Sequence, residues 1–495
     1  MSRLVAVIDI GKTNKKVALI NDRLEVVAHR AASFPAQVDS SGILVEQIDA
    51  IETWLLDNLA DLYREQPYDA LSVTTHGATW AGIAEDGSLA IPVIAYEHHL
   101  DEAAQVALDT EFFRLCGPLE KLQEETGTCD LPLLINPAKM ALFAQQKLPA
   151  GYAKIRHLLN YPQFWGWRLT GAMATETTYA ANHSFLLDIR AKQPSSAATA
   201  LGLAHAVYCA FKRPWDQLGT LSTTLQARLG LPALPVTVGI HDSNSALLPY
   251  LIKQQGRDFV LNSTGTWCVA MHRVASVNYR PEELGQKVIF NIDALGGLTK
   301  TSFLMGGQDY GLYHGLIGGA DPAFTAARVD AALADAGRAV LPGAFASQFP
   351  KCRGGLLDAG KFITLDALKA GMKPAWFTDP ALGHDLLNIS LALQTEVALR
   401  RTDITDDTTI FVEGGFRHNP VFLGVLSALF PKATIACTSL AQATASGAAL
   451  LGHALLAGQD PGALADRIVI EEQPVARPVL ANLAAYRRAW LTAVS

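Results

Sequence analysis

The most constraining feature of this sequence is a short pattern that occurs twice, about half the chain apart. In VAVIDIGKTNKKVALI (residues 5–20), two apolar runs rich in β-branched residues flank a loop that contains Gly11. In DFVLNSTGTWCVAMHRV (residues 258–274), two apolar runs again flank a loop, which here contains Gly265. Each half is therefore expected to begin with a strand, a Gly/Thr loop and a returning strand. This recurrence predicts a duplicated domain, with coincidence of common turn residues as the alternative.

The composition of these loops suits a phosphate group. Glycine lets backbone amides approach a ligand closely, while Thr13 adds a hydroxyl and Lys12 a positive charge. A P-loop would be followed by a helix, whereas KKVALI continues as a strand, so GKTN is not a Walker A loop. Alone, each stretch is equally compatible with an ordinary β-hairpin. Together, two such loops facing each other across a cleft would hold the phosphates of one nucleotide.

Length and composition indicate two domains without long disordered segments. A chain of 495 residues is too long for one core, and 49% of its residues are hydrophobic while 18% are charged. The net charge of −7 is spread without long runs, which argues against nucleic acid or an anionic membrane as partner.

The cysteines and the N-terminus favour an intracellular location. The 6 cysteines are widely spaced and form no C-x-x-C pair, as expected of reduced thiols. The N-terminus enters a strand directly, without a signal-peptide pattern, and no apolar run approaches about 18 residues. We therefore expect a cytoplasmic protein.

Several further segments have the pattern of an α/β fold. The apolar spacing over residues 49–63 predicts a helix, with Asp49 and Glu52 as a capping box. Residues 71–75 and 92–96 are expected to be strands, and LGLPALPVTVGIHD (residues 229–242) is expected near a domain boundary. Residues 323–360 are expected to form a helical insertion or connection.

The last third contains a strand, a Gly-Gly turn and a helix in TIFVEGGFRHNPVFLGVLSALF. Asn419 is suited to the N-cap of the helix and Pro420 to its first position. Because Gly414 and Gly415 have no side chains where the strand ends, a flat adenine ring would fit against the backbone. TIACTS then predicts another strand, and ATASGAALLGHALLAG a small-residue helix that packs closely on its neighbours.

These motifs, taken together and in this order, resemble those of the FGGY family of carbohydrate kinases, within the actin/Hsp70/hexokinase-type ATPase superfamily. The resemblance extends over roughly residues 3–460 and rests on five motifs. It implies an α/β fold of two ribonuclease H-like domains, at residues 1–245 and 246–495, with ATP and sugar in the cleft between them. The five motifs are DIGKTNKK, NSTGTW, GIHDSNSA, VEGGFRHNPVF and ATASGAALLG.

The resemblance also implies roles for individual residues. Asp242, in GIHDSNSA, matches the catalytic aspartate and would accept the proton of the sugar hydroxyl; without the resemblance, the N-cap of the following helix is the favoured interpretation. Asp9 matches the acidic residue that holds Mg²⁺, largely through water, or else is a strand-end turn residue. The implied nucleotide-binding residues are Gly11, Lys12, Thr13, Asn14, Ser263, Thr264, Gly265, Thr266, Gly307, Gly414, Gly415 and Asn419.

The expected sugar site departs from the family pattern. In TTHGATW, His76 and Gly77 match residues that contact sugar hydroxyls, although a lone histidine is often structural. The next element usually resembles W-x-D-x-R, whereas AYEHHLD has histidine and leucine at the Asp and Arg positions. Tyr96 and Glu97 are the remaining candidates there. A metal site at residues 97–99 is not expected, because neighbouring residues on a strand point to opposite faces.

The sequence thus predicts an ATP- and Mg²⁺-dependent kinase of a small ketose, such as xylulose, L-fuculose or L-rhamnulose. Another polyol or sugar is the near alternative, and an actin-like ATPase or a sugar sensor is the alternative from another class. Lys12 replaces the usual threonine and either adds charge near the γ-phosphate or faces solvent. A homodimer is one quaternary arrangement open to the chain.

Overall fold

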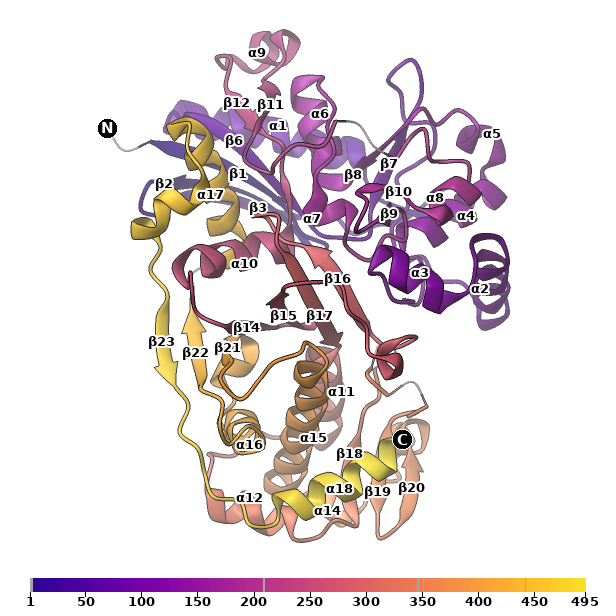
Figure 1. Ribbon diagram of the computed structural model, residues 1–495, viewed down its shortest axis with the longest axis vertical. Helices are drawn as coiled ribbons and strands as arrows, with labels where there is room; N and C mark the ends of the chain where they lie inside the picture. The colour runs from indigo at the N-terminus through magenta and orange to yellow at the C-terminus, as the bar shows by residue number, and fades with distance from the viewer. Residues whose placement is uncertain (1–2, 208–209, 345–346, 350, 441) are drawn as a thin grey trace.

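The computed structural model describes residues 3–207, 210–344, 347–349, 351–440 and 442–495. Two α/β units lie one above the other, and each is built on a seven-stranded mixed sheet (Figure 1). The five cysteines in this part of the chain are free, while Cys209 lies outside it. Within the described residues, no helix has the length and apolar character needed to cross a membrane.

The first sheet contains the first of the two repeated hairpins. Its strands are β11 (Gln217–Thr220), β12 (Pro235–Thr237), β6 (Ala70–Thr75), β1 (Leu4–Ile10), β2 (Asn14–Asn21) and β3 (Val26–Ser33), in that order, with β13 (Ile240–His241) also paired to β6. β1 runs antiparallel to β2 and parallel to β6. The loop with Gly11 therefore lies at the same edge as the end of β6, where His76 follows.

Helices cover both faces of this sheet. On one face, α1 (Ile48–Glu65) and α6 (Tyr161–Thr170) pack against the strands through buried aliphatic and aromatic side chains. On the other lies α17 (Ala443–Ala457), a helix from the far end of the chain (Figure 1). Its small residues allow close approach, since a Cβ atom at Gly452 would lie 2.5 Å from Val5 Cγ1. The predicted small-residue helix is therefore confirmed.

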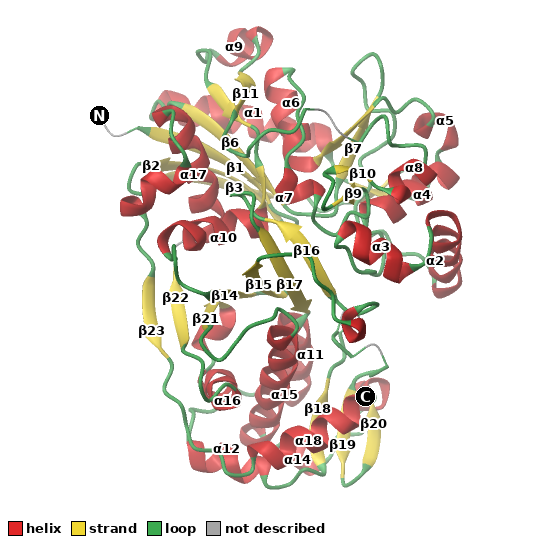
Figure 2. Ribbon diagram, in the orientation of Figure 1, coloured by secondary structure: helices red, strands yellow, loops and turns green. Residues whose placement is uncertain are grey.

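A smaller subdomain extends from the first sheet and has its own apolar core, whose residues come from segments between Ile43 and Val207 but not from α6. It lies beside the first sheet in Figure 2. Its elements, with the remaining short elements of the first half, are β4 (Gln37–Val38), β5 (Leu44–Val45), β7 (Trp80–Ile83), α2 (Glu102–Cys116), α3 (Leu119–Thr126), α4 (Pro137–Lys147), α5 (Pro149–Tyr152), β8 (His157–Asn160), α7 (Thr177–Ala180), β9 (Leu187–Asp188), β10 (Gln193–Pro194), α8 (Ser196–Ala200), α9 (Thr223–Leu229) and α10 (Asp242–Lys253).

The second sheet contains the second hairpin in the corresponding place. Its strands, in order, are β16 (Val288–Ile292), β17 (Leu298–Leu304), β15 (Cys268–Val274), β14 (Phe259–Thr264), β21 (Thr409–Gly414), β22 (Ile435–Ser439) and β23 (Glu471–Pro474). β14 runs antiparallel to β15 and parallel to β21, as β1 does to β2 and β6. The repeated strand–loop–strand pattern is thus confirmed, and both hairpins occupy equivalent positions.

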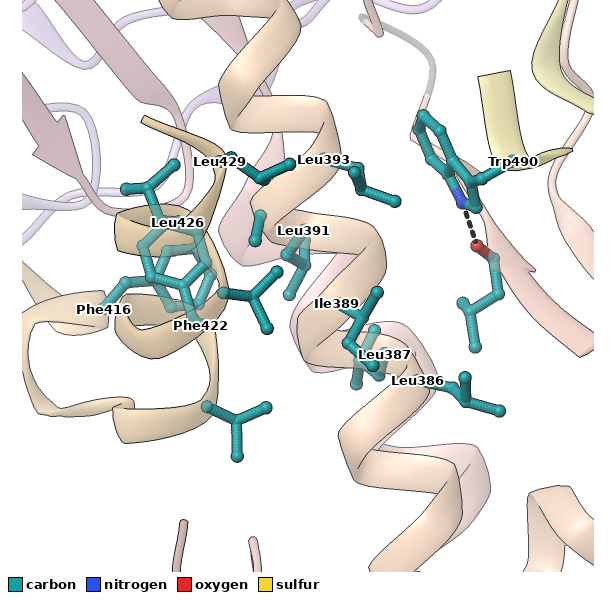
Figure 3. Close-up of a cluster of buried hydrophobic side chains, with 14 of the residues drawn as sticks. Leu386, Leu387, Ile389, Leu391, Leu393, Phe416, Phe422, Leu426, Leu429 and Trp490 are labelled. Carbon is teal, nitrogen blue, oxygen red and sulfur yellow. Dashed lines mark hydrogen bonds between the residues drawn. The ribbon is translucent and has the colours of Figure 1, made fainter. Parts of the chain in front are cut away.

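The second unit has a helical core beneath its sheet. α15 (Pro380–Arg400) runs through this core, and its leucines pack in one cluster with Phe416, Phe422 and Trp490 (Figure 3). The Nε1 atom of Trp490 donates a hydrogen bond to Val340 O at 3.1 Å. The other elements here are η1 (Pro281–Glu283), α11 (Gly306–Ile317), α12 (Ala326–Leu333), β18 (Arg338–Leu341), β19 (Gly355–Asp358), β20 (Lys361–Thr364), α13 (Leu365–Lys369), α14 (Ala375–Thr378), η2 (Gly415–His418), α16 (Pro420–Leu429), η3 (Pro461–Arg467) and α18 (Leu483–Val494).

Three local predictions were wrong. The described part of residues 323–360 contains the helix α12, but β18 and β19 also pair there within a three-stranded sheet, so the segment is not simply helical. Residues 92–96 form no strand, because only Ile94 makes an isolated bridge. The helix predicted at residues 49–63 is present as α1, but its predicted capping box is wrong, because the helix begins at Ile48 and its N-cap is Gln47. Asp49 therefore lies inside the first turn and forms no capping box with Glu52.

Candidate functional site

Three adjoining cavities lie at the junction of the two units; the first and second are lined by residues of both units, and the third by residues of the second unit. The first has a volume of about 400 Å³, the second about 530 Å³ and the third about 290 Å³. Ser263 lines both the first and the second cavity, and Gly415 lines both the second and the third. The three cavities therefore form a row, with the second in the middle.

Asp242 lies in the first cavity, at the start of a helix. β13 ends at His241, whose side chain accepts the N–H of Ser243, and α10 begins at Asp242. The N-cap alternative for Asp242 is therefore wrong, since His241 caps this helix. Asp242 Oδ1 accepts from Ser243 N at 2.6 Å. A third of the side chain is open to the cleft, yet the surrounding protein desolvates the carboxyl and raises the pKa of Asp242 to about 6.

Two of the predicted sugar-contacting residues, His76 and Gly77, line the same cavity. His76 Nε2 is buried without a hydrogen-bond partner, and burial lowers the pKa of His76 to about 3, which keeps the ring neutral. Gly77 allows close packing, because a Cβ atom there would lie 2.6 Å from His241 Nε2 and 2.8 Å from His183 Nε2. Tyr96 stands edge-on to His76, with ring centroids 5.8 Å apart.

Lys12 lines the first cavity and not the second. Its Nζ atom lies 2.5 Å from both Glu46 Oε1 and Glu97 Oε2, and 5.0 Å from the Tyr96 ring centroid. The Lys12 side chain is 19% exposed and that of Glu46 is fully buried, so Lys12 does not simply face solvent. Glu97 is connected to the first cavity by its ion pair with Lys12.

Glu97 and its neighbour His98 differ from the strand geometry expected of them. Glu97 lies in a turn rather than on a strand, so the alternation argument does not apply to it. His98 Nδ1 instead accepts the backbone N–H of Leu44 at 3.2 Å.

Several residues of the first cavity were not predicted from the sequence. Asn182 and His183 come from the segment after α7, where His183 has a φ of 41°. His183 Nδ1 is buried without a partner, and burial lowers the pKa of His183 to about 3. No local pattern marks this segment, since only the tertiary fold brings it beside His76. Trp267 and Asn291, from the second unit, complete the opposite wall.

Carboxylates gather in the second cavity together with two cations. Burial raises the pKa of Asp9 to about 6 and that of Glu413 to about 7, and Glu413 Oε2 has no hydrogen-bond partner. Lys16 and Arg417 line the same cavity. Oxygen ligands of this kind suit a hard divalent cation such as Mg²⁺, and the two cations suit phosphate oxygens. Of these residues, sequence reasoning identified only Asp9.

The two hairpin loops differ in what they contribute. A Cβ atom at Gly11 would lie 2.8 Å from Asn14 O, so the turn itself requires glycine, while Thr13 and Asn14 line none of the three cavities. In the second loop, Ser263 lines two cavities, and the Thr264 hydroxyl accepts from Phe416 N at 3.0 Å. Thr266 lines none of the three.

The third cavity brings together most of the residues predicted to bind adenosine. It is lined by Thr264, Gly265, Gly307, Tyr310, Asp321, Gly415, Phe416, His418 and Asn419. Gly414, which lines the second cavity, has a φ of 85°, and a Cβ atom there would lie 2.0 Å from Thr264 O. Asn419 is the predicted N-cap of α16, since its side chain accepts from Phe422 N at 3.0 Å.

Comparison with known proteins identifies the family. Residues 4–249 match the N-terminal domain of the FGGY family of carbohydrate kinases, and residues 256–461 match the C-terminal domain of carbohydrate kinase FGGY. The chain belongs to the FGGY family. This confirms the family resemblance that was inferred from the five motifs. It also confirms the predicted fold of two actin-like α/β domains. The domain boundary after residue 245 stays a prediction.

Individual relatives have low sequence identity to this chain. An L-fuculokinase of Escherichia coli K12 is 28% identical over 288 residues, which cover 56% of this chain and 57% of the relative. The chain thus matches little more than half the length of that relative. A rhamnulokinase of Bacteroides thetaiotaomicron is 32% identical over 111 residues, or 22% of each chain. The crystal structure of a carbohydrate kinase from Novosphingobium aromaticivorans has a TM-score of 0.76 and 25% identity, covering 100% of this chain and 98% of that one.

Proposed function

We propose that this protein transfers the γ-phosphate of ATP to a hydroxyl of a small neutral sugar. The favoured substrates are ketopentoses and 6-deoxyketohexoses of the xylulose, L-fuculose or L-rhamnulose type. Asp242 acts as general base in a direct in-line transfer. The observation that carries this proposal is the position of Asp242, whose carboxyl lines a cavity of mixed polar and apolar side chains that adjoins the carboxylate-lined second cavity.

The first cavity has the chemistry of a polyhydroxylated, uncharged ligand. His76 Nε2 and His183 Nδ1 are buried without partners, and both rings are neutral at physiological pH. Neutral imidazoles exchange hydrogen bonds with hydroxyl groups. The charge of Lys12 is already balanced by Glu46 and Glu97, and the described residues that line the cavity include no other lysine or arginine to pair with a substrate carboxylate. The names of the L-fuculokinase and rhamnulokinase relatives agree with such a sugar.

ATP is expected to lie along the second and third cavities. Gly307, Gly415 and Asn419 would face adenosine, and the Lys16 and Arg417 side chains would face the phosphates. Asp9 and Glu413 fit Mg²⁺, because burial disfavours their charged forms until a cation is present. When bound, Mg²⁺ neutralises charge on the phosphate oxygens.

In the chemical step, the Asp242 carboxylate accepts the proton of the attacking hydroxyl. At pH values above about 6 the carboxylate is deprotonated and able to do so. His76 and His183 fix the sugar so that this hydroxyl faces the second cavity. Closure of the cleft around both ligands would exclude water, which would otherwise compete as the acceptor.

A substrate screen tests the proposal. Purified protein with MgATP is given xylulose, L-fuculose, L-rhamnulose, glycerol or gluconate, and ADP release and phosphorylated product are both measured. We expect product with a neutral ketose and none with gluconate, whose carboxylate meets Asp242 and the neutralised Lys12. ADP release that is independent of every sugar would favour an actin-like ATPase. Sugar binding without ADP release would favour a sensor.

A further inference from the structure

Two histidines and an aspartate lie together where the end of α11 meets the start of α15. His314 is in the last turn of α11, Asp321 in the loop that follows, and His384 near the N-terminus of α15. Their candidate ligand atoms all lie within 4.8 Å of one another, which no other group of His, Cys, Asp or Glu achieves in the described part of the chain. Asp321 also lines the third cavity.

The local backbone explains why these three residues meet. Gly318 and Gly319 have φ values of 77° and 76°, which reverse the chain after α11 and return Asp321 toward the helix end. Gly383 allows the two helices to approach, since a Cβ atom there would lie 3.2 Å from Ile317 Cγ2. The cluster is therefore fixed by the packing of α11 on α15.

The hydrogen bonding of His384 leaves one buried ring nitrogen without a hydrogen-bond partner. The side chain is fully buried, and Nε2 lies 3.0 Å from Gly318 O. Because a carbonyl oxygen only accepts, Nε2 carries the hydrogen, and in neutral imidazole Nδ1 is then unprotonated. Nδ1 lies 3.0 Å from Asp321 Oδ1 but has no hydrogen-bond partner. A cation bound to both atoms would remove the repulsion between them.

A hydrogen bond from Tyr310 orients Asp321. Its other oxygen, Oδ2, accepts from the Tyr310 hydroxyl at 2.6 Å. His384 and Asp321 thus each use their distal atom in a hydrogen bond and present the other atom to the cluster. Proteins orient metal ligands in this way.

We propose that His314, Asp321 and His384 bind a divalent transition-metal ion of the zinc class, with water as a fourth ligand. In a tetrahedral zinc site, ligand atoms lie roughly 3.4 Å apart at bond lengths of about 2.0–2.1 Å, so the half-buried His314 ring turns inward on binding. Two imidazoles make the site unsuited to Mg²⁺, which prefers oxygen ligands. The ion would join the loop after α11 to α15 and hold Tyr310 against the third cavity.

The test uses the untagged, full-length protein after treatment with a chelator. Cobalt is titrated while visible absorption is recorded, and zinc is added while thermal unfolding is followed. For wild type we expect one equivalent of cobalt with visible bands that zinc abolishes, and a zinc-dependent rise in the melting temperature, because the ion binds the folded state. Tyr310→Phe should weaken binding by roughly 10–100-fold.

Two ligand variants and a matched control decide the outcome. His314→Ala and Asp321→Asn replace residues that are not fully buried, and both should fold and lose the saturable cobalt signal. His205→Ala, which removes an exposed histidine elsewhere, should bind as wild type does. Binding of one equivalent by both ligand variants, or no saturable binding by wild type, would overturn the proposal. In the second case, His384 and Asp321 form a simple ion pair.

Discussion

Burial raises the pKa of Asp242 to about 6, and this determines how the proposed kinase should respond to pH. A general base must be deprotonated, so kcat/KM should be low at pH 5 and rise through pH 6 to a plateau. Asp242→Asn should lower kcat by roughly 10²–10⁴-fold. ATP affinity, measured by calorimetry, should change little. Asp86→Asn, at an exposed turn, serves as control. Turnover near the wild-type value in Asp242→Asn would remove this residue from the mechanism.

The same carboxyl should make the folded protein less stable as pH rises. Between about pH 4 and pH 6 the folded state keeps a proton on Asp242 that the unfolded state has lost, so the free energy of unfolding falls with increasing pH. The amide of Asp242→Asn does not titrate, so this variant avoids the loss of stability at high pH. Its melting temperature should therefore exceed that of wild type at pH 8 and differ little from it at pH 4. An equal difference at both pH values would contradict the raised pKa.

Lys12 balances a buried charge and should be important for stability. Lys12→Met leaves Glu46, whose side chain is fully buried, without its cation. Breaking such a pair costs roughly 3 kcal/mol, whereas removing both charges is nearly neutral. Denaturant unfolding should therefore show a large loss in Lys12→Met and substantial recovery in Lys12→Met/Glu46→Gln. If the double variant is no more stable than the single variant, another interaction determines the effect.

At the scale of elements, the second hairpin loop depends on the start of α11. A Cβ atom at Gly307 would lie 2.2 Å from Gly265 O, whereas one at Gly265 would meet only Trp267 O, at 3.6 Å. Gly307→Ala should therefore displace the loop, cost about 1–3 kcal/mol and weaken ATP binding. Gly265→Ala should unfold as wild type does. Melting curves and ATP titration of the two variants provide the comparison, and equal stability would show that the loop adapts freely.

Elements with a strong local pattern could be predicted from the sequence. The hairpins around Gly11 and Gly265 follow from β-branched runs broken by turn residues, and Asn419-Pro420 marks the start of α16. Residues 92–96 had the composition of a strand, yet only Ile94 forms a bridge. Asn182 and His183 could not be predicted as site residues, because contacts distant in sequence bring them to the first cavity. Glu413 was missed because nothing local distinguishes it from any strand-end carboxylate.

At the scale of the whole molecule, ligands should draw the two units together. The first cavity has walls from both units, with His76 and Tyr96 from one and Trp267 and Asn291 from the other. A bound sugar therefore contacts both, and closure keeps water from the γ-phosphate. Small-angle scattering with an ATP analogue and a true substrate should show a smaller radius of gyration than the analogue alone. An unchanged radius, with equal ATPase rates with and without sugar, would favour the actin-like alternative.

The position of α17 also affects the order in which the protein is made. Four strands of the first sheet, β1, β2, β3 and β6, are synthesised by Thr75, but the helix that covers one of their faces begins at Ala443. At about 5–20 residues per second, synthesis from Thr75 to Ala443 takes roughly 20 to 75 seconds. Throughout that interval Val5, Val7 and Ile20 lack their final cover. The nascent first domain therefore passes through a long stage with one face of its sheet uncovered, which ends only when nearly all of the chain has been translated.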